Sequence, residues 1–446
     1  MLLLLFLFFI TVGLAQPRGE ATDILEQLSR FTGGDVFLAA GPTAGSNDLW
    51  LHLSCNATGS VPSAIALASS LPVRGLFVQD CPLLPTEVAA LNATVRSVHL
   101  VRPRAAFESA ATLPGSLAAM SQLSRLWVEG PTNVTGAWTM AALENLALLD
   151  VPDIWRVPER KPTNLTSLLM RAQQGVAAAP PPLRLSAEFL RVPSLIVENV
   201  ALHPALFEQA TFNSSKVLVL RNCSLSGALP PALGSAGGLE VLDLSANNLR
   251  GPLFSLQLMR SLETLALSGN PLGGVLLPKT ESLRLRTLRL DSCGLSGPLT
   301  MLPPNLRVLS ARNNALNGTL LALSDLRSLE QLYLDRNAIS GTVPTELRRT
   351  QLVELNLTFN NLDGNFPDVL RRVDVCDVLA GNNFRFCQPN TDGCCVGAPS
   401  GVQLYSSQVF AGVFVFILAV ACVSPLLRCL QGELLYVAVL HRKHKI

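Results

Sequence analysis

The sequence predicts an α/β-type repeat solenoid, a curved array with a parallel sheet on its concave side, followed by a single transmembrane helix. Three observations lead to this prediction. Apolar segments of one spacing recur along most of the chain, 31 Gly and 30 Pro punctuate it, and an uncharged apolar run lies near its C-terminus. Frequent turn residues argue against long helical bundles, and a hydrophobic fraction of 49% argues against disorder.

The charge balance excludes one class of partner. The 34 Lys and Arg residues nearly offset the 32 Asp and Glu residues, which gives a net charge of +2. Proteins that bind nucleic acid through their whole surface need a strongly basic one. We therefore expect no nucleic acid among the partners of this chain.

The middle of the chain repeats one unit with the template LxxLxLxxNxLxG. Six segments follow it, namely LEVLDLSANNLRG, LETLALSGNPLGG, LRTLRLDSCGLSG, LRVLSARNNALNG, LEQLYLDRNAISG and LVELNLTFNNLDG, and KVLVLRNCSLSG before them fits as well. The asparagine position of the template is filled by Cys223, Asn247, Asn270, Cys293, Asn314, Asn337 and Asn360. A fixed period of 20 to 50 residues is the sequence signature of a repeat architecture.

This template resembles that of the leucine-rich repeat family. The tails LSGALP, LRGPL, LSGPL and ISGTVP resemble the plant-type subclass, which also occurs in protist surface proteins. The chain is similar to the kinase-lacking receptor-like proteins of plants and to the leucine-rich repeat surface proteins of protists. The resemblance implies a protein or peptide ligand at the concave face, and it implies that signalling needs a co-receptor with an intracellular domain.

The physical chemistry of the repeat agrees with that resemblance. Each LxL is expected to be a short strand whose alternate side chains point to opposite faces. One unit cannot bury its leucines alone, but units stacked about 4.8 Å apart build a continuous core. The asparagine can bond backbone groups that would otherwise stay unpaired, and a cysteine can fill the same buried position.

Weaker copies of the unit extend the array in both directions to about fifteen repeats. They lie near Asn56, Cys81, Pro103, Pro131, Val151, Gln173, Val200 and Asn382. We place the repeats at 48–386, with the strongest at 215–365. The open ends of a solenoid need caps, and we expect them at 16–47 and in a cysteine-rich cap and stalk at 387–408.

The two ends of the chain predict its location. Residues 1–15 form an apolar run with Gly13 and Ala15 before a plausible cleavage site, as in a signal peptide, although no Lys or Arg precedes the run. Residues 409–427 are apolar and uncharged, and about 20 such residues cross a bilayer. The tail at 428–446 ends in basic residues, which face the cytosol. These features predict a single-pass type I protein of the plasma membrane. The alternatives are a buried or uncleaved first run and a lipid-anchor signal in place of the second.

The cysteines outside the apolar runs fall into three groups. Four cluster at the C-terminal end, where the resemblance implies two disulfides of unknown pairing, among Cys376, Cys387, Cys394 and Cys395. Cys55 and Cys81 lie on neighbouring repeats and are a further candidate pair. Cys223 and Cys293 lie three repeats apart, too far to join, so we expect buried free thiols. A zinc site at the cluster is the alternative, but it lacks companion histidines.

Eight N-x-S/T sequons suit an extracellular surface. They begin at Asn56, Asn92, Asn133, Asn164, Asn213, Asn222, Asn317 and Asn356. Two of them, Asn222 and Asn356, fall on or beside the strand face, where a glycan would block a ligand.

The residue between the two leucines of each LxL should form one row on the concave face, here called the central row. It comprises His52, Phe77, His99, Trp127, Ala147, Leu169, Ile196, Val219, Asp243, Ala266, Arg289, Ser310, Tyr333 and Asn356. Its first half is apolar and aromatic, and its second half is polar. An exposed apolar stripe often marks an interaction surface, so Phe77, His99 and Trp127 form a hypothetical partner-binding patch. An error of register or cover by the N-terminal cap is the alternative.

Two positions further along each strand lies a second row, which contains Asp291, Arg312 and Asp335. Together with Arg289 and Tyr333 these charges could bind a polar ligand. The simpler interpretation is a solvated row of ion pairs, each worth less than about 1 kcal/mol.

No pattern of residues predicts catalysis, a metal or a cofactor. His52 and His99 are two repeats apart, about 10 Å, which is too far for one metal ion. The sequence contains no nucleophile elbow, Walker loop or zinc-protease motif. We therefore expect a non-catalytic binding protein. An adhesion or coat glycoprotein without a dedicated ligand is the second hypothesis, and an ectoenzyme is the third.

Overall fold

The computed structural model describes most of the repeat region. The described residues are 36–40, 49–54, 71–79, 91, 94–101, 111–112, 117, 120–130, 132–133, 137, 140–150, 157–158, 160–172, 182–207, 212, 214–253, 258–275, 284–299, 302–365 and 373–386. The signal peptide, stalk, transmembrane segment and tail expected from the sequence lie outside these residues. Among the residues that are described, no helix is both long and apolar enough to cross a bilayer.

The chain forms two compact units that divide between Leu143 and Glu144. Unit 1 contains a sheet in the order β1-β2-β3-β4-β6. Strand β1 is antiparallel to β2, and the following neighbours are parallel. A small pair, β5 and β7, lies outside this sheet. The strands are β1 (Val36–Ala40), β2 (Leu49–Ser54), β3 (Val73–Gln79), β4 (Ser97–Val101), β5 (Ala111–Thr112), β6 (Arg125–Glu129) and β7 (Thr132–Asn133).

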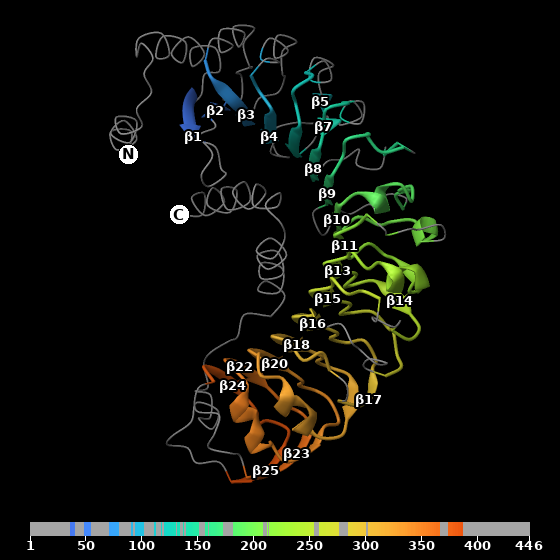
Figure 1. Ribbon diagram of the computed structural model, residues 1–446, viewed down its shortest axis with the longest axis vertical. Coiled ribbons are helices and arrows are strands. Elements are labelled where there is room, and N and C mark those ends of the chain that lie inside the picture. The colour runs from blue at the N-terminus through green and yellow to red at the C-terminus, as the bar shows by residue number, and fades with distance from the viewer. Residues whose placement is uncertain are drawn as a thin grey trace, which may run out of the picture. The chain divides into compact units, whose positions relative to one another are not determined.

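Unit 2 stacks its strands in chain order, and every described pair is parallel (Figure 1). These strands are β8 (Asn145–Leu149), β9 (Ser167–Arg171), β10 (Ser194–Glu198), β11 (Val217–Arg221), β13 (Val241–Asp243), β15 (Thr264–Ala266), β16 (Thr287–Arg289), β18 (Val308–Ser310), β20 (Gln331–Tyr333), β22 (Glu354–Asn356) and β24 (Val375–Asp377). The parallel repeat solenoid expected from the sequence is thereby confirmed for the described residues.

The leucines of the template fill the core, as the alternation of the strand requires. In the repeat around β13, Leu239, Leu242 and Leu244 are all 0% exposed, and the equivalent leucines of the later repeats are buried as well. Burying one such side chain contributes about 1.5–3 kcal/mol. A repeat supplies three or four of them, and its neighbours supply the surface against which they pack.

The asparagine position holds consecutive turns together. The Asn270 Oδ1 accepts the backbone N–H of Leu249 at 3.0 Å, while Nδ2 donates to the carbonyls of Leu244 at 2.9 Å and Leu267 at 2.8 Å. The residues at 247, 314, 337, 360 and 382 make equivalent bonds. Each amide therefore satisfies backbone groups that the turn leaves unpaired.

The residue before the asparagine position has a left-handed backbone. Its φ is 56° at Ala246, 53° at Ser292 and 52° at Asn313, and Gly269 fills this position with φ 72°. This conformation turns the chain out of the strand. It favours glycine and, to a smaller extent, asparagine.

The returning segments correct one part of the expected fold class. In the described part of unit 2 they contain 3-10 helices and short second strands, so the α component of the α/β-type class is wrong there. The helices are η5 (Phe189–Arg191), η6 (Pro204–Phe207), η7 (Pro231–Ser235), η8 (Leu320–Asp325) and η9 (Thr345–Arg349). Short connections with Pro and Gly leave no room for full α-helical turns.

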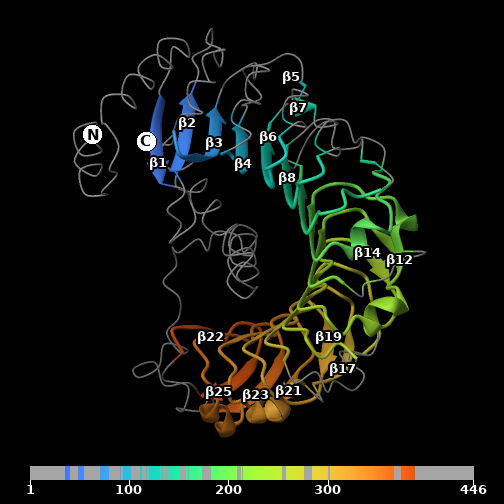
Figure 2. The same ribbon diagram turned by 45° about the horizontal axis from the view of Figure 1, so that its top comes forward.

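The short strands pair along the array, away from the main strands (Figure 2). They are β12 (Ser226–Ala228), β14 (Asn248–Arg250), β17 (Ser296–Pro298), β19 (Ala315–Asn317), β21 (Ser340–Gly341), β23 (Asn361–Asn365) and β25 (Asn383–Phe386). Their sequences are the LSG-type tails of the template.

Candidate functional site

The strand registers place the residues of the central row opposite one another within each unit. In unit 1, His52 pairs with Phe77, Phe77 with His99, and His99 with Trp127. In unit 2 the row runs from Ala147 to Asn356 in the expected order and continues at Asp377. The register read from the sequence is therefore correct, including that of the weak repeats.

The expected exposure of the aromatic patch is wrong. The exposed fractions are 7% for His52, 6% for Phe77, 4% for His99 and 3% for Trp127. Their ring centroids follow one another at 4.9, 4.9 and 5.1 Å, so each ring covers the face of the next. The alternation of side-chain directions along each strand predicted the correct face of the sheet for these residues. It could not predict that neighbouring rings pack on one another and bury their faces.

Burial also sets the charge of the two histidines. It lowers the pKa of His52 to about 4, and burial together with His52 lowers the pKa of His99 to about 3. Both imidazoles are therefore neutral at pH 7. The Nε2 of His99 and the Nε1 of Trp127 are buried without a hydrogen-bond partner among the described residues.

In unit 2 the central row contains both buried and partly accessible residues. Buried members are Ala147, Leu169, Val219, Asp243, Ala266 and Ser310, whereas Ile196, Arg289, Tyr333 and Asn356 are partly buried and Asp377 is exposed. From Arg289 onwards, the accessible residues of this row are polar.

The second row forms a connected network rather than a simple charge ladder. Asp291 accepts from the Ser310 hydroxyl at 2.6 Å and from the backbone N–H of Arg312 at 2.8 Å. The Arg312 Nε lies 3.2 Å from the Asp335 Oδ1. The Arg312 guanidinium also stacks 4.1 Å from the centre of the Tyr333 ring. Four of the residues expected to bind a ligand are thus fixed by one another, namely Asp291, Arg312, Tyr333 and Asp335.

Tyr333 is held at its other end by β22. Its hydroxyl donates to Glu354, which also accepts from the Gln331 amide at 3.0 Å. Burial and this hydrogen bond raise the pKa of Tyr333 well above its usual range, so the phenol remains a donor. Glu354 was not among the residues expected from the sequence, because it lies two residues before Asn356 and so belongs to neither row.

Arg289 differs from the other arginines of this face. Its Nε is buried without a hydrogen bond, and no ion pair to it is found among the described residues. Burial lowers its pKa, although Asp291 and Tyr333 oppose the effect. Arg289 is consequently a partly buried cation on the concave face to which the described residues provide no ion pair.

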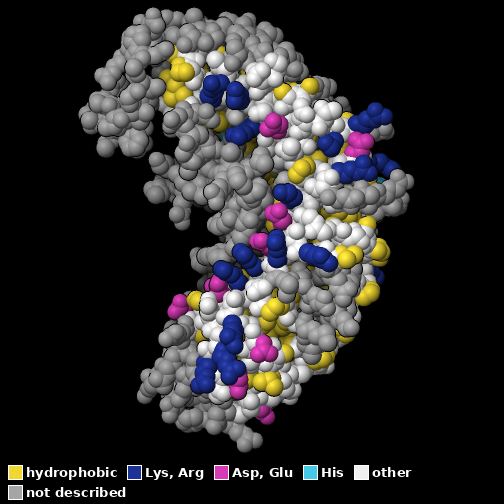
Figure 3. Space-filling model, viewed as in Figure 1, with side chains coloured by type: hydrophobic (Ala, Val, Ile, Leu, Met, Phe, Trp, Pro, Cys, Tyr) yellow, Lys and Arg dark blue, Asp and Glu magenta, His cyan; other side chains and the backbone are white. Residues whose placement is uncertain are grey.

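A second network was missed from the sequence. Arg171 contacts Glu198 at 2.6 Å, Arg221 contacts Glu198 at 3.5 Å, and Arg221 also pairs with Asp243, which is 1% exposed. Following the second row back from Asp291 to β11, β10 and β9 would have found the first three residues. Figure 3 shows acidic and basic side chains interspersed over the visible surface rather than gathered by sign.

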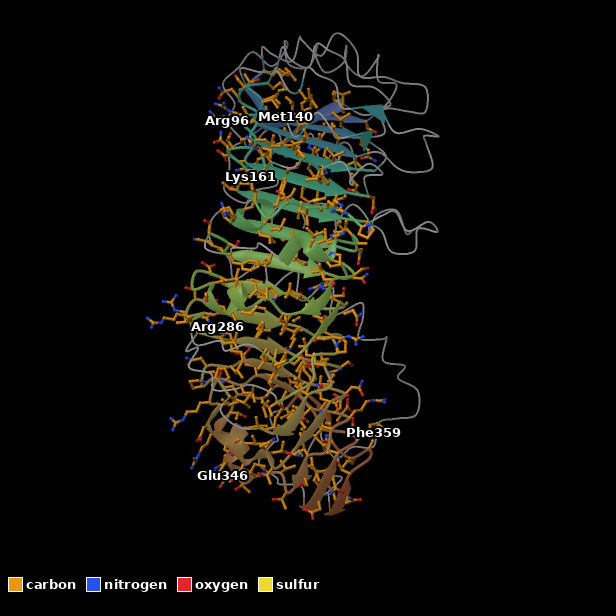
Figure 4. The ribbon with its side chains drawn as sticks, turned by 90° about the vertical axis from the view of Figure 1, so that its right-hand side faces the viewer. Arg96, Met140, Lys161, Arg286, Glu346 and Phe359 are labelled. Atoms are coloured by element: carbon orange, nitrogen blue, oxygen red, sulfur yellow. The ribbon has the colours of Figure 1, made fainter. Side chains whose placement is uncertain are left out.

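The two lateral edges of the sheet carry different residues. Arg286, before β16, and Phe359, after β22, project from opposite edges (Figure 4). Phe359 is 52% exposed and packs beneath the Arg336 guanidinium.

Only some of the expected glycosylation sites lie among the residues that the structure describes. Asn164, Asn222 and Asn317 are exposed, and Asn356 is partly buried on the central row. Asn133 lies in β7, and Asn56, Asn92 and Asn213 lie outside the described residues. The Asn356 Oδ1 accepts from the hydroxyl of its sequon residue Thr358 at 2.9 Å.

Cys223 and Cys293 are buried free thiols, as expected. Cys376 is disulfide-bonded. The pairing expected for it, and the candidates Cys55, Cys81, Cys387, Cys394 and Cys395, fall outside the described residues. Among the side chains that are described, no group of three could hold a metal ion.

Comparison with known proteins agrees with this architecture. The family model described as Leucine Rich Repeat matches residues 351–373. No curated protein matches the chain.

Two solved structures resemble it over 75% of its length. One is the leucine-rich repeat ectodomain of the plant membrane receptor kinase GASSHO1/SCHENGEN3 from Arabidopsis thaliana, in complex with CASPARIAN STRIP INTEGRITY FACTOR 2, at 20% identity and a TM-score of 0.52. The other is PEPR1-AtPEP1, at 21% identity and 0.54. The match covers 44% and 48% of those chains, so this chain spans about half their length. Its fold is that of the leucine-rich repeat solenoid seen in a plant receptor ectodomain.

Proposed function

We propose that the chain is a single-pass cell-surface protein that binds a peptide or protein ligand through the concave face of unit 2. In this proposal it is receptor-like. The observation that carries this proposal is the accessible polar part of the central row, where Arg289 and Tyr333 lie on a rigid sheet beside Arg312 and Asp335.

The geometry of this face suits a polar ligand. The stack of Arg312 on Tyr333 and the bond from Tyr333 to Glu354 fix these side chains before a ligand arrives, which reduces the entropy lost on binding. The described residues provide no ion pair to the Arg289 guanidinium, so a carboxylate or a carbonyl of the ligand can bind there. The similar ectodomain of GASSHO1/SCHENGEN3 is in complex with CASPARIAN STRIP INTEGRITY FACTOR 2, which supports a ligand for this fold.

The location belongs to the proposal as well. The apolar run at 1–15, the run at 409–427 and the basic tail at 428–446 support an extracellular array on one membrane helix. The proposal includes a co-receptor with an intracellular domain as the partner in signalling. Full-length chain with a tag at each end tests this arrangement, because external protease on intact cells should remove the repeats and spare the C-terminal tag. Protection of the repeats would contradict it.

Binding is tested with the full-length chain in detergent and a phage-displayed library of random peptides. We expect enrichment of a peptide family whose binding is lost, by at least about tenfold, in Arg289→Ala and in Tyr333→Ala. Arg307→Ala is the matched control, because Arg307 pairs with Glu330 on the exposed edge of the same repeats. A concave site would be contradicted if Arg307→Ala lost as much peptide binding as the other two variants. It would also be contradicted if the enriched peptides bound all three variants as well as the wild type.

A coat or adhesion glycoprotein is the second candidate, and the sequons favour it. Asn164, Asn222 and Asn317 are exposed, and a glycan on Asn356 would stand beside Tyr333 in the central row. Mass spectrometry of glycopeptides from the purified full-length chain separates the two functions. Full occupancy of Asn356 favours the coat, and an unmodified Asn356 favours ligand binding.

A further inference from the structure

The aromatic row of unit 1 contains two histidines in an unusual setting. His52 stacks on Phe77 with an interplanar angle of 29°, and His99 meets the other side of Phe77 edge-on at 87°. Trp127 follows His99 at a centroid distance of 5.1 Å. The row thus places two titratable rings on either side of a benzene ring, inside a face from which water is excluded.

The surroundings of these rings favour their neutral form. The Nε2 of His99 and the Nε1 of Trp127 already lack hydrogen-bond partners among the described residues. A protonated His99 would add a full charge and a second N–H to the same site. Burying a charge without a partner is far more costly than burying a neutral ring.

The other charged groups of the packed strands do not offset that cost. Strands β1 and β2 carry none besides His52, β3 carries the exposed Arg74, and β4 carries none besides His99. Strand β6 carries Arg125 and Glu129, which are in register with Ser97 and Val101, on either side of His99. The described strands therefore place no acidic residue in register with His52 or His99.

We propose that unit 1 is an acid-responsive element, in which proton uptake by His52 and His99 breaks the ring row and loosens strands β2 to β6 while unit 2 stays folded. The inference does not depend on whether unit 2 binds a ligand. Unit 2 lacks an equivalent, because the one histidine described there, His203, is partly exposed and its Nδ1 accepts from the backbone N–H of Ala205 at 3.2 Å.

The pKa values determine how the stability of unit 1 changes with pH. Burial lowers the pKa of His52 to about 4 and that of His99 to about 3, from the ordinary value of 6.5 in the unfolded chain. The unfolded state therefore takes up protons first as the pH falls. The stability of unit 1 is complete above pH 6.5 and declines as the pH falls from 6.5 towards 4 and 3. At pH 5 the folded-to-unfolded ratio should drop by about 30-fold for each histidine.

Hydrogen exchange of the full-length chain, corrected for the intrinsic effect of pH on amide exchange, tests this proposal. Between pH 7.5 and pH 5 we expect the amides of β3, β4 and β6 to lose at least about tenfold in protection, and the amides of β16 to β22 to lose less than about twofold. Unchanged protection in unit 1, or an equal loss in both units, would overturn the proposal.

Two variants separate titration from a general acid effect. His52→Phe combined with His99→Phe keeps aromatic rings in the row but removes its protonation, so protection at pH 5 should stay near its value at pH 7.5. His203→Gln, the control, should retain the loss seen in the wild type. If the double variant does not fold, His52→Phe alone should halve the loss on a logarithmic scale. An undiminished loss in the variant used shows that these histidines are not the sensor.

Discussion

The backbone N–H of Cys223 donates to the Oδ1 of Asn247 at 2.9 Å, so each asparagine position completes the turn of the repeat before it. Cys223 occupies the same position one repeat earlier and uses its thiol differently. Its Sγ donates to the carbonyl of Val197 at 3.3 Å, but it offers no comparable acceptor. Asparagine and cysteine are therefore only partly equivalent at this position.

This difference predicts a graded loss of stability at Asn270. Asn270→Ala should lower the free energy of unfolding by about 3–5 kcal/mol, because it leaves the buried N–H of Leu249 and two carbonyls unpaired. Asn270→Cys should cost about 1–2 kcal/mol less, because a thiol can still donate. Urea unfolding measures both. Asn248→Ala, on the exposed neighbour, should stay within about 0.5 kcal/mol. Equal losses in all three variants would show that the ladder is not the cause.

The left-handed position before each asparagine predicts a reciprocal pair of variants. Ala246 has φ 56° and Gly269 has φ 72° at equivalent sites. Ala246→Gly should raise the melting temperature slightly, since it relieves about 1 kcal/mol of backbone strain. Gly269→Ala should lower it by a similar amount, because the new Cβ meets Ala246 only at ordinary contact distance and adds strain without a clash. Calorimetry of both variants tests the sign, and shifts in the same direction would contradict this account.

The ion pair between Arg221 and Asp243 predicts a non-additive double variant. Asp243→Leu leaves Arg221 partly buried with only its 3.5 Å contact to Glu198 and should cost about 3–5 kcal/mol. The double variant Arg221→Met with Asp243→Leu should cost much less, because it removes both charges together. Chemical unfolding of the single and double variants gives the coupling. For comparison, Arg307→Ala breaks an exposed pair and should cost under about 1 kcal/mol. Additive losses would mean that the pair is not coupled.

The free thiols predict a labelling pattern. Burial raises the pKa of Cys293 to about 11 and raises that of Cys223 well above its usual range. At pH 8 only about one Cys293 thiol in a thousand is ionised, so both residues should resist iodoacetamide in the folded chain and react in urea. Peptide mass spectrometry measures the two extents. Rapid labelling of either residue in the folded protein would contradict its place in the core.

The sequence predicted the repeat and its register because both depend on local rules. Leucines at fixed spacing define the buried side of each strand. Because the next repeat has the same spacing, the residue between its two leucines lies opposite that of the repeat before it. The central row from His52 to Asn356 could therefore be predicted within each unit. The returning segments depend on how tightly successive coils pack. That property is not local, and the α component of the expected class was accordingly wrong in the described part of unit 2.

The candidate site was predictable only in part. The face of Arg289, Tyr333 and Asp335 was predicted, but the stacking of Arg312 on Tyr333 depends on rotamers that alternation does not encode. The pairing of Arg171 with Glu198 joins residues 27 positions apart, and it becomes visible only once the weak repeats are aligned with the strong ones.

The asparagine ladder gives the array a direction. Asn337 accepts from the Leu316 N–H and donates to the Ala311 carbonyl, both in the coil made earlier. Removing the next coil on the C-terminal side would leave these buried N–H and carbonyl groups without the asparagine that binds them, whereas removing the earlier coil would leave the asparagine amide without these two partners. During synthesis the coils on the N-terminal side emerge from the ribosome first. The asparagine of each new coil then binds backbone groups of the coil before it, and the last coil made is the one whose groups lack this partner.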